Sequence, residues 1–124
     1  MNKAFIPDRN DIIWLDFEPS TSKEIGKYRP ALVLSSKAYN HQTGLLICCP
    51  VSSSIRGGVT EVKVNNLDQP SVVAANLIQT LFWKHRKAKK IIQAEESVLE
   101  NVILRIIPLI GADEVIEKLL NAEN

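Results

Sequence analysis

The spacing of the apolar residues changes near residue 94, and this change restricts the chain to a small set of folds. Before it, β-branched and aromatic runs alternate with polar loops, as strands do. After it, apolar residues recur every three or four positions from about Glu95, as on one face of a helix. The expected strands are Asp11–Phe17, Pro30–Ser35, Leu45–Pro50, Thr60–Val64, Val72–Ala75, Leu77–Trp83 and Lys89–Gln93.

Many short strands followed by terminal helices predict a mainly β fold, in which a small, strongly curved barrel has a helix packed on it. Pro108 should bend or stop the first helix and Gly111 should break it, before a second short helix that contains Val115 and Leu120. With 124 residues the chain fits a single domain, 1–124, with a barrel over about 6–93 and helices over about 95–121.

The net charge of +1 hides an uneven distribution. Residues 1–90 carry thirteen Lys and Arg against seven Asp and Glu, whereas residues 91–124 carry two against seven. The larger part can therefore present a positive face to an anionic partner, although a solvated charged surface is the alternative.

The two cysteines, Cys48 and Cys49, are adjacent in an apolar run. Adjacent strand residues point to opposite faces, so both are expected to be core thiols of a reducing compartment. No spaced Cys pair accompanies the two histidines, so no metal site is expected. Without an apolar run of membrane-spanning length or a signal peptide at the N-terminus, the expected location is the cytoplasm.

The segment from Glu24 to Arg29 combines a carboxylate with a guanidinium that precedes Pro30 and an apolar strand. A residue before proline favours extended geometry, so Arg29 is expected at the mouth of that strand. A guanidinium can hold a phosphate through two hydrogen bonds, and a carboxylate can accept a proton. These properties suit a phosphodiester substrate, and an ordinary charged loop is the alternative.

Three further polar segments are candidates for a site. The first is a run of three hydroxyls at the end of a strand, Ser52, Ser53 and Ser54, which can donate to phosphate oxygens. The second is Arg56 with the two glycines after it, which let the backbone approach a ligand closely. Residues 84–90 hold five Lys and Arg, which attract a polyanion, next to aromatic residues on which bases can stack. An ordinary solvated loop is the alternative for the serine segment, and a charged hairpin is the alternative for the basic segment.

Taken together these residues resemble the MazF/PemK family of toxin endoribonucleases. The resemblance covers roughly residues 4–111 and rests on Ile6–Asp8, Asp11–Pro19, Glu24, Arg29–Ser35, Tyr39–Asn40, Thr43–Leu45, Cys48–Pro50 and Gln79–Trp83. It implies an SH3-like, strongly bent β-barrel with a C-terminal helix, the plasmid maintenance toxin fold of CcdB and MazF. It also implies a homodimer and a cognate MazE-like antitoxin, whose acidic, disordered tail competes with RNA.

The resemblance further implies sequence-specific cleavage of single-stranded RNA without a metal or cofactor. In such cleavage the 2′-hydroxyl attacks the adjacent phosphorus and leaves a 2′,3′-cyclic phosphate and a 5′-hydroxyl. Arg29 matches the family's catalytic arginine, Glu24 its loop glutamate, and Ser52 the position of its catalytic threonine. The candidate RNA-binding residues are Lys27, Tyr28, Ser53, Arg56, Gln79, Lys84 and Arg86.

Two departures from the family pattern keep alternatives open. Ser52 lacks the threonine methyl, and Asn76-Leu77 replaces an acidic residue followed by glutamine. A catalytically weakened module that binds RNA or an antitoxin is therefore one alternative. A gyrase inhibitor similar to CcdB is another, but the chain ends at Asn124 without the Trp-Gly-Ile end of those toxins.

Overall fold

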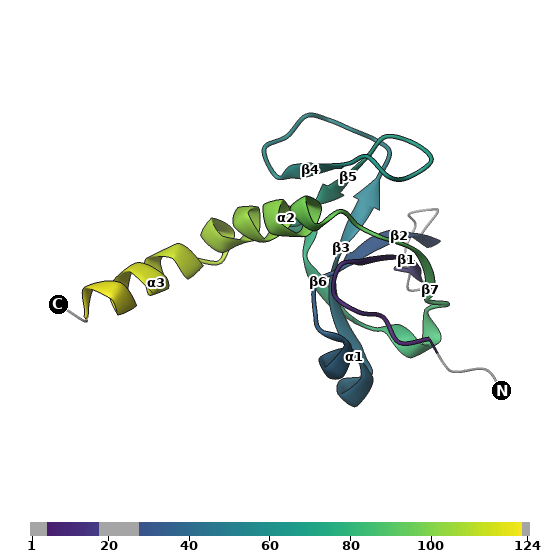
Figure 1. The fold of residues 1–124 in the computed structure, drawn as a ribbon, viewed down its shortest axis with the longest axis horizontal. Coiled ribbons are helices and arrows are strands. Elements are labelled where there is room, and N and C mark those ends of the chain that lie inside the picture. Colours follow the sequence, from purple (N-terminus) through teal and green to yellow (C-terminus); the bar gives the residue numbers. More distant parts are fainter. Residues whose placement is uncertain (1–4, 18–27, 123–124) are drawn as a thin grey trace.

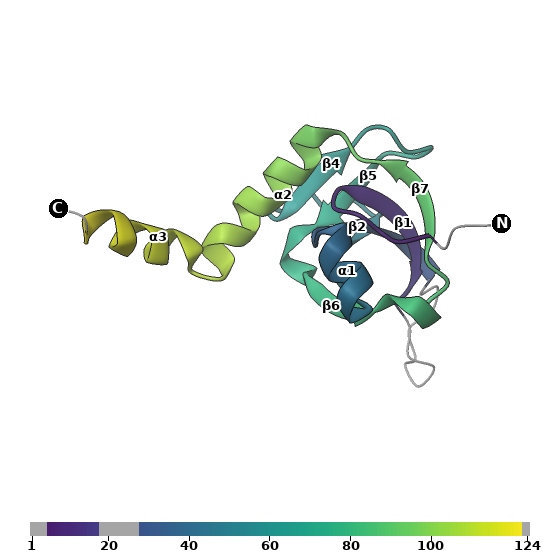
Figure 2. The same ribbon diagram turned by 60° about the horizontal axis from the view of Figure 1, so that its bottom comes forward.

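The computed structural model describes residues 5–17 and 28–122, which form a curled antiparallel sheet and three α-helices (Figure 1). The sheet has the strand order β4-β5-β3-β2-β1-β7, and β6 pairs with the first half of β3. Its strands are β1 (Asp11–Asp16), β2 (Tyr28–Val33), β3 (Leu45–Ser52), β4 (Glu61–Val64), β5 (Ser71–Ala74), β6 (Gln79–Phe82) and β7 (Lys89–Gln93). The predicted mainly β fold with C-terminal helices is confirmed, as a half-barrel that curls around its core (Figure 2).

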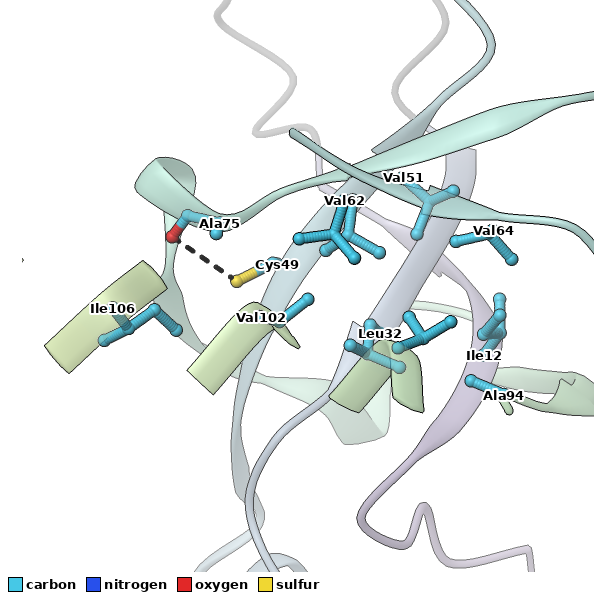
Figure 3. Close-up of a cluster of buried hydrophobic side chains, with 12 residues drawn as sticks. Ile12, Leu32, Cys49, Val51, Val62, Val64, Ala75, Ala94, Val102 and Ile106 are labelled. Carbon is cyan, nitrogen blue, oxygen red and sulfur yellow. Dashed lines mark hydrogen bonds between the residues drawn. The ribbon is translucent and has the colours of Figure 1, made fainter. Parts of the chain in front are cut away.

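Two buried clusters lie on opposite faces of the central strands, because successive side chains alternate. One cluster joins residues such as Ile12 and Leu32 to Val98, Val102 and Ile106 of helix α2 (Glu96–Leu109) (Figure 3). The other consists of Ile13, Leu15, Ala31, Val33, Leu46, Cys48 and Trp83. The apolar face of α2 is buried at Val102 and Ile106, and α2 covers one face of the sheet.

The adjacent thiols of Cys48 and Cys49 are both buried and unbridged, one in each cluster, as predicted. Burial raises the pKa of each thiol from 9.0 to about 12, because a thiolate loses its hydration there. The neighbouring Cys49 raises the pKa of Cys48 further.

Helix α1 (Lys37–Thr43) connects β2 to β3. The hydroxyl of Ser36 accepts a hydrogen bond from the N–H of Tyr39 and caps its start. Gly44 ends it with φ +74°, a conformation that glycine adopts without strain, and then β3 begins.

Several boundaries differ from those predicted. Strand β2 begins at Tyr28 rather than at Pro30, because Tyr28 and Arg29 pair with β1. Strand β3 continues to Ser52, where β5 pairs with it. The predicted strand Leu77–Trp83 is shortened to β6 by two 3₁₀ turns, η1 (Ala75–Leu77) and η2 (Trp83–His85).

Pro108 does not stop α2, which ends one residue later at Leu109. Gly111, with φ +74°, separates α2 from α3 (Ala112–Asn121), as predicted. Within the described ranges, 5–17 and 28–122, no helix is long and apolar enough to cross a membrane.

Candidate active site

A cavity of about 390 Å³ lies where β2 begins and β3 ends, and Arg29 and Ser52 both line it. We refer to it as the Arg29–Ser52 cavity. Its lining also contains Pro50, Ser54, Arg56, Gly58, Thr60, Glu61, Val72, Ala74, Asn76 and Leu77. Of the residues predicted for the site, Arg29, Ser52 and Arg56 therefore share one cavity.

The pairing of β2 with β3 explains how Arg29 and Ser52 come together. Ala31 pairs with Pro50, and the two strands are antiparallel. Two residues back along β2 and two residues forward along β3 therefore lead to Arg29 and Ser52, which line the same cavity. Residues two apart on a strand share a face, which puts both side chains on one face of the sheet. Both residues are half-buried, and Leu15 beside Arg29 and Val72 beside Ser52 are buried. Apolar neighbours of this kind strengthen charge interactions, because they exclude water.

The hydroxyl of Ser52 is oriented by the loop that follows it. Its Oγ accepts a hydrogen bond of 3.0 Å from the backbone N–H of Ser54. A hydroxyl that accepts at its oxygen still carries a proton to donate. Ser52 can therefore offer an O–H donor to a phosphate oxygen in the cavity.

Glu61 fixes the loop that carries Arg56 to the cavity. Its carboxylate accepts hydrogen bonds from the N–H of Gly57 at 2.7 Å and of Arg56 at 3.2 Å. Its own N–H donates to the carbonyl of Gly58 at 3.1 Å. Sequence reasoning missed this residue, because an outward-facing Glu in an alternating strand gives no sign of the loop it contacts.

The Asn76-Leu77 departure from the family pattern also lies at the cavity. The side-chain oxygen of Asn76 accepts a hydrogen bond of 3.2 Å from the hydroxyl of Thr60. Asn76 is left with amide N–H donors, whereas an acidic residue offers only acceptors when it is ionised. The cavity wall thus differs chemically from the family pattern at this point.

Ser53 and Tyr28 lie away from the Arg29–Ser52 cavity. Ser53 lines a second cavity of about 440 Å³ together with Trp14 and Pro30. The ring of Tyr28 stacks on Trp14 with centroids 5.4 Å apart, and its hydroxyl donates to the carbonyl of Lys87 at 2.9 Å. Both aromatic rings are partly exposed, so the pair offers a stacking surface.

The basic segment 84–90 is divided between exposed and structural positions. Lys84 is exposed on η2. The backbone N–H of Trp83, also on η2, donates to the carbonyl of Gly44 just before β3 begins, so Lys84 lies near the end of β3 opposite to Ser52. The guanidinium of Arg86 donates to the carbonyls of Phe82 and Asp16 at 3.1 and 2.9 Å.

Lys90, in the same segment, and Gln79, on the preceding strand, also lie apart from the Arg29–Ser52 cavity. Lys90 forms an ion pair of 3.4 Å with Asp11, which reduces the positive charge of the segment. Gln79, on β6, donates to the carbonyl of Leu77 at 3.4 Å and is not part of the cavity lining.

Glu24 and Lys27 lie outside the described residues, so their predicted roles stay predictions. Within the part of the chain that the structure describes, no group of three or more His, Cys, Asp or Glu could hold a metal ion.

The fold and the cavity define a small, mainly β protein with a polar cavity at the ends of its central strands, and comparison with known proteins identifies its class. The family model described as "PemK-like, MazF-like toxin of type II toxin-antitoxin system" matches residues 8–110. The endoribonuclease toxin MazF of Escherichia coli K12 is 32% identical over 111 residues, which are 90% of this chain and 100% of that relative. The endoribonuclease toxin ChpB of the same organism is 31% identical over 105 residues, 80% of this chain and 90% of ChpB.

Solved structures of MazF chains match this chain in both fold and sequence. MazF of Deinococcus radiodurans superposes with a TM-score of 0.80 and 38% identity, over 87% of this chain and 99% of that one. A MazE–MazF complex from the same organism gives a TM-score of 0.75 and 35% identity, over 86% and 98%. The chain therefore belongs to the PemK-like, MazF-like toxins of type II toxin–antitoxin systems.

Proposed function

We propose that this toxin is a sequence-specific endoribonuclease that cleaves single-stranded RNA without a metal ion and so inhibits translation. The main observation in its support is that Arg29 and Ser52, from separate strands, line one cavity. The names of its relatives, which are endoribonucleases, support the same activity. A single strand suits the chemistry, because in-line attack requires a nucleotide that is not held in a helix.

In the proposed reaction the ribose 2′-oxygen forms a bond to phosphorus while the bond to the 5′-oxygen breaks. The 2′-hydroxyl proton passes to a base, and the departing 5′-oxygen takes a proton from an acid. The products are a 2′,3′-cyclic phosphate and a 5′-hydroxyl. The pentacoordinate intermediate is more negative than the substrate, so groups that stabilise this charge accelerate the step.

Arg29 acts as a charge clamp on the nonbridging oxygens, because a guanidinium stays protonated and offers two parallel donors. Ser52 donates its O–H to one of the same oxygens, and the loop N–H of Ser54 holds it in place. Glu24 is the proposed base, since a carboxylate can accept the 2′-hydroxyl proton. Arg56, held through Glu61, adds positive charge at the cavity mouth.

The partners are proposed on the same basis. Relatives are seen in complexes with MazE, and an antitoxin of that kind with an acidic tail suits the excess of positive charge in residues 1–90. A homodimer and a cytoplasmic site of action follow from the family likeness. The exposed Trp14–Tyr28 stack and Lys84 are proposed to contact RNA outside the scissile phosphate.

The test is to incubate the purified protein with a long mixed RNA in EDTA and to map the ends of the fragments. Fragments with 2′,3′-cyclic phosphate and 5′-hydroxyl ends at a recurring sequence are expected, and Arg29→Ala should abolish them. Intact RNA, or cleavage that EDTA stops, contradicts the proposal.

A second candidate is a module that binds RNA or an antitoxin without cleavage. The observation that favours it is that both departures from the family pattern, Ser52 and Asn76-Leu77, line the Arg29–Ser52 cavity. Retention of labelled RNA on the protein without fragments, under the conditions of the cleavage test, supports this module instead.

A further inference from the structure

Helix α3 exposes an apolar stripe and lies beyond the part of the chain shared with the family. The family match ends at residue 110, and α3 begins at Ala112. Both views show it extending away from the strands past the end of α2 (Figures 1 and 2). Val115, Ile116, Leu119 and Leu120 are 49–65% exposed, and none of the residues Ala112–Asn121 is buried.

Packing against the rest of the fold does little to stabilise this helix. A helix of 10 residues is marginal in water by itself, and most helix stability in proteins comes from packing of an apolar face. Leu109 and Ile110, which precede α3 at the end of α2, are 53% and 69% exposed as well. Six half-exposed aliphatic side chains together present on the order of several hundred Å² of apolar surface, the size of patch that marks a protein interface.

We propose that α3 pairs with α3 of a second copy of this chain, the two helices lying parallel about a twofold axis. In such an interface each copy supplies the same stripe, so the apolar surface of one helix covers that of the other. The pairing is separate from RNA cleavage and does not depend on the proposed nuclease activity.

The charges beside the stripe favour a second copy in the parallel orientation. At 100° per residue, Asp113 and Glu117 lie on one flank of the stripe and Lys118 lies on the other. In a parallel pair about a twofold axis, the flank that carries Lys118 in one helix faces the flank that carries Asp113 and Glu117 in the other. Lys118 then faces the acidic flank of the second copy, whereas antiparallel helices bring like-charged flanks together.

The relatives argue against an antitoxin as the occupant of this stripe. MazF of Escherichia coli is matched over its full length by 111 residues of this chain. The Deinococcus radiodurans chains that are solved with MazE are covered to 98–99% by 86–87% of this chain. Those complexes thus form with chains that have almost no length left for a counterpart of α3.

The first experiment measures self-association of the full chain by sedimentation equilibrium over a wide concentration range. Leu119→Glu places a carboxylate in the seam and should raise the concentration for half-association by roughly 100-fold, because a charge is costly to bury. Asn121→Glu adds the same charge on the opposite face of α3 and should behave like the wild type. If both variants match the wild type, the proposal is wrong.

The second experiment fixes the orientation by oxidative cross-linking of full-length Ala112→Cys. Parallel helices bring the two copies of residue 112 together, whereas an antiparallel pair centred on Glu117 separates them by roughly 15 Å, at 1.5 Å per residue. A disulfide-linked dimer is expected for Ala112→Cys and not for Glu114→Cys, which points away from the seam. The native Cys48 and Cys49 are buried and should not compete.

An equal yield of cross-linked dimer from Glu114→Cys contradicts a specific seam between the two α3 helices.

An antitoxin is the competing occupant of the α3 stripe. If Leu119→Glu leaves self-association unchanged and instead weakens binding of a purified MazE-type antitoxin, α3 is a docking helix for that partner and the proposal fails. Because RNA cleavage is measured separately, a failure here leaves the proposed nuclease untouched.

Discussion

The carboxylate of Glu61 accepts a hydrogen bond of 2.7 Å from the backbone N–H of Gly57, and this contact anchors the loop beside the Arg29–Ser52 cavity. Arg56 is the neighbouring residue of that loop, and its N–H is also bound to Glu61. The position of an exposed cationic side chain therefore depends on an acidic residue that has no assigned chemical step.

Glu61→Ala should lower the rate of RNA cleavage about tenfold with little loss of stability, because the freed N–H groups are exposed and water can bind them. Arg56→Ala should have a similar effect, and the double variant should be no worse than either single one. Cleavage rates together with thermal unfolding test this coupling. Additive losses would show that Glu61 acts independently of the Arg56 loop.

Arg29→Lys should lower the cleavage rate by about 100-fold or more. Lysine keeps the charge but offers a point donor in place of two parallel N–H groups. The rate constant at saturating RNA is the quantity to compare, and RNA binding should change less than this rate. Nearly full activity of the lysine variant would exclude the bidentate clamp.

Ser52→Ala should reduce the cleavage rate by about 100-fold, the usual effect of removing one donor to a developing oxyanion. Ser52→Thr should match or exceed the wild type, because the added methyl restricts the hydroxyl to fewer rotamers. Ser53→Ala is the matched control, since Ser53 lines the other cavity. If Ser53→Ala causes as large a loss as Ser52→Ala, the assignment of the donor is wrong.

Gly44→Ala should destabilise the fold more than Gly57→Ala, although the two glycines have similar φ values of +74° and +78°. A Cβ at Gly44 meets Cε1 of Phe82 at 2.7 Å, whereas among the described residues nothing lies within 4 Å of a Cβ at Gly57. The strained backbone alone costs about 1 kcal/mol, and the clash should add a similar amount. Urea unfolding of both variants measures the difference, and equal losses would contradict the predicted clash.

The buried thiols predict a loss of stability in alkali. Below pH 9 they are protonated in both states and contribute no pH dependence. Between pH 9 and pH 12 the unfolded thiols ionise while the folded ones, with pKa raised to about 12, stay protonated. The free energy of unfolding should then fall by up to about 1.4 kcal/mol per pH unit for each thiol.

Urea titrations at pH 8 and pH 10 measure this slope, and Cys48→Ala should make it shallower. Neither thiol should react with iodoacetamide in the native protein at pH 8, because the reagent requires an exposed thiolate. Rapid alkylation of the folded chain would show that the pair is accessible.

Local pattern was enough to predict the strands and the two C-terminal helices of this chain. Alternation and turn residues gave the strands, and three- and four-residue spacing gave α2 and α3, because these periods follow from the geometry of each element alone. The same alternation predicted that Cys48 and Cys49 lie on opposite faces. The likeness to a toxin family added Arg29 and Ser52 as a pair, which spacing in the sequence cannot do.

Only the tertiary structure decided what each of these residues touches. The register of β2 on β3 brings Arg29 and Ser52 to one cavity and turns Ser53 toward another. Glu61 contacts the loop before it, and α3 extends past the sheet with its apolar stripe exposed. Contacts of this kind depend on pairing and loop closure between segments distant in the chain, whereas a sequence pattern reports only the neighbours within one element.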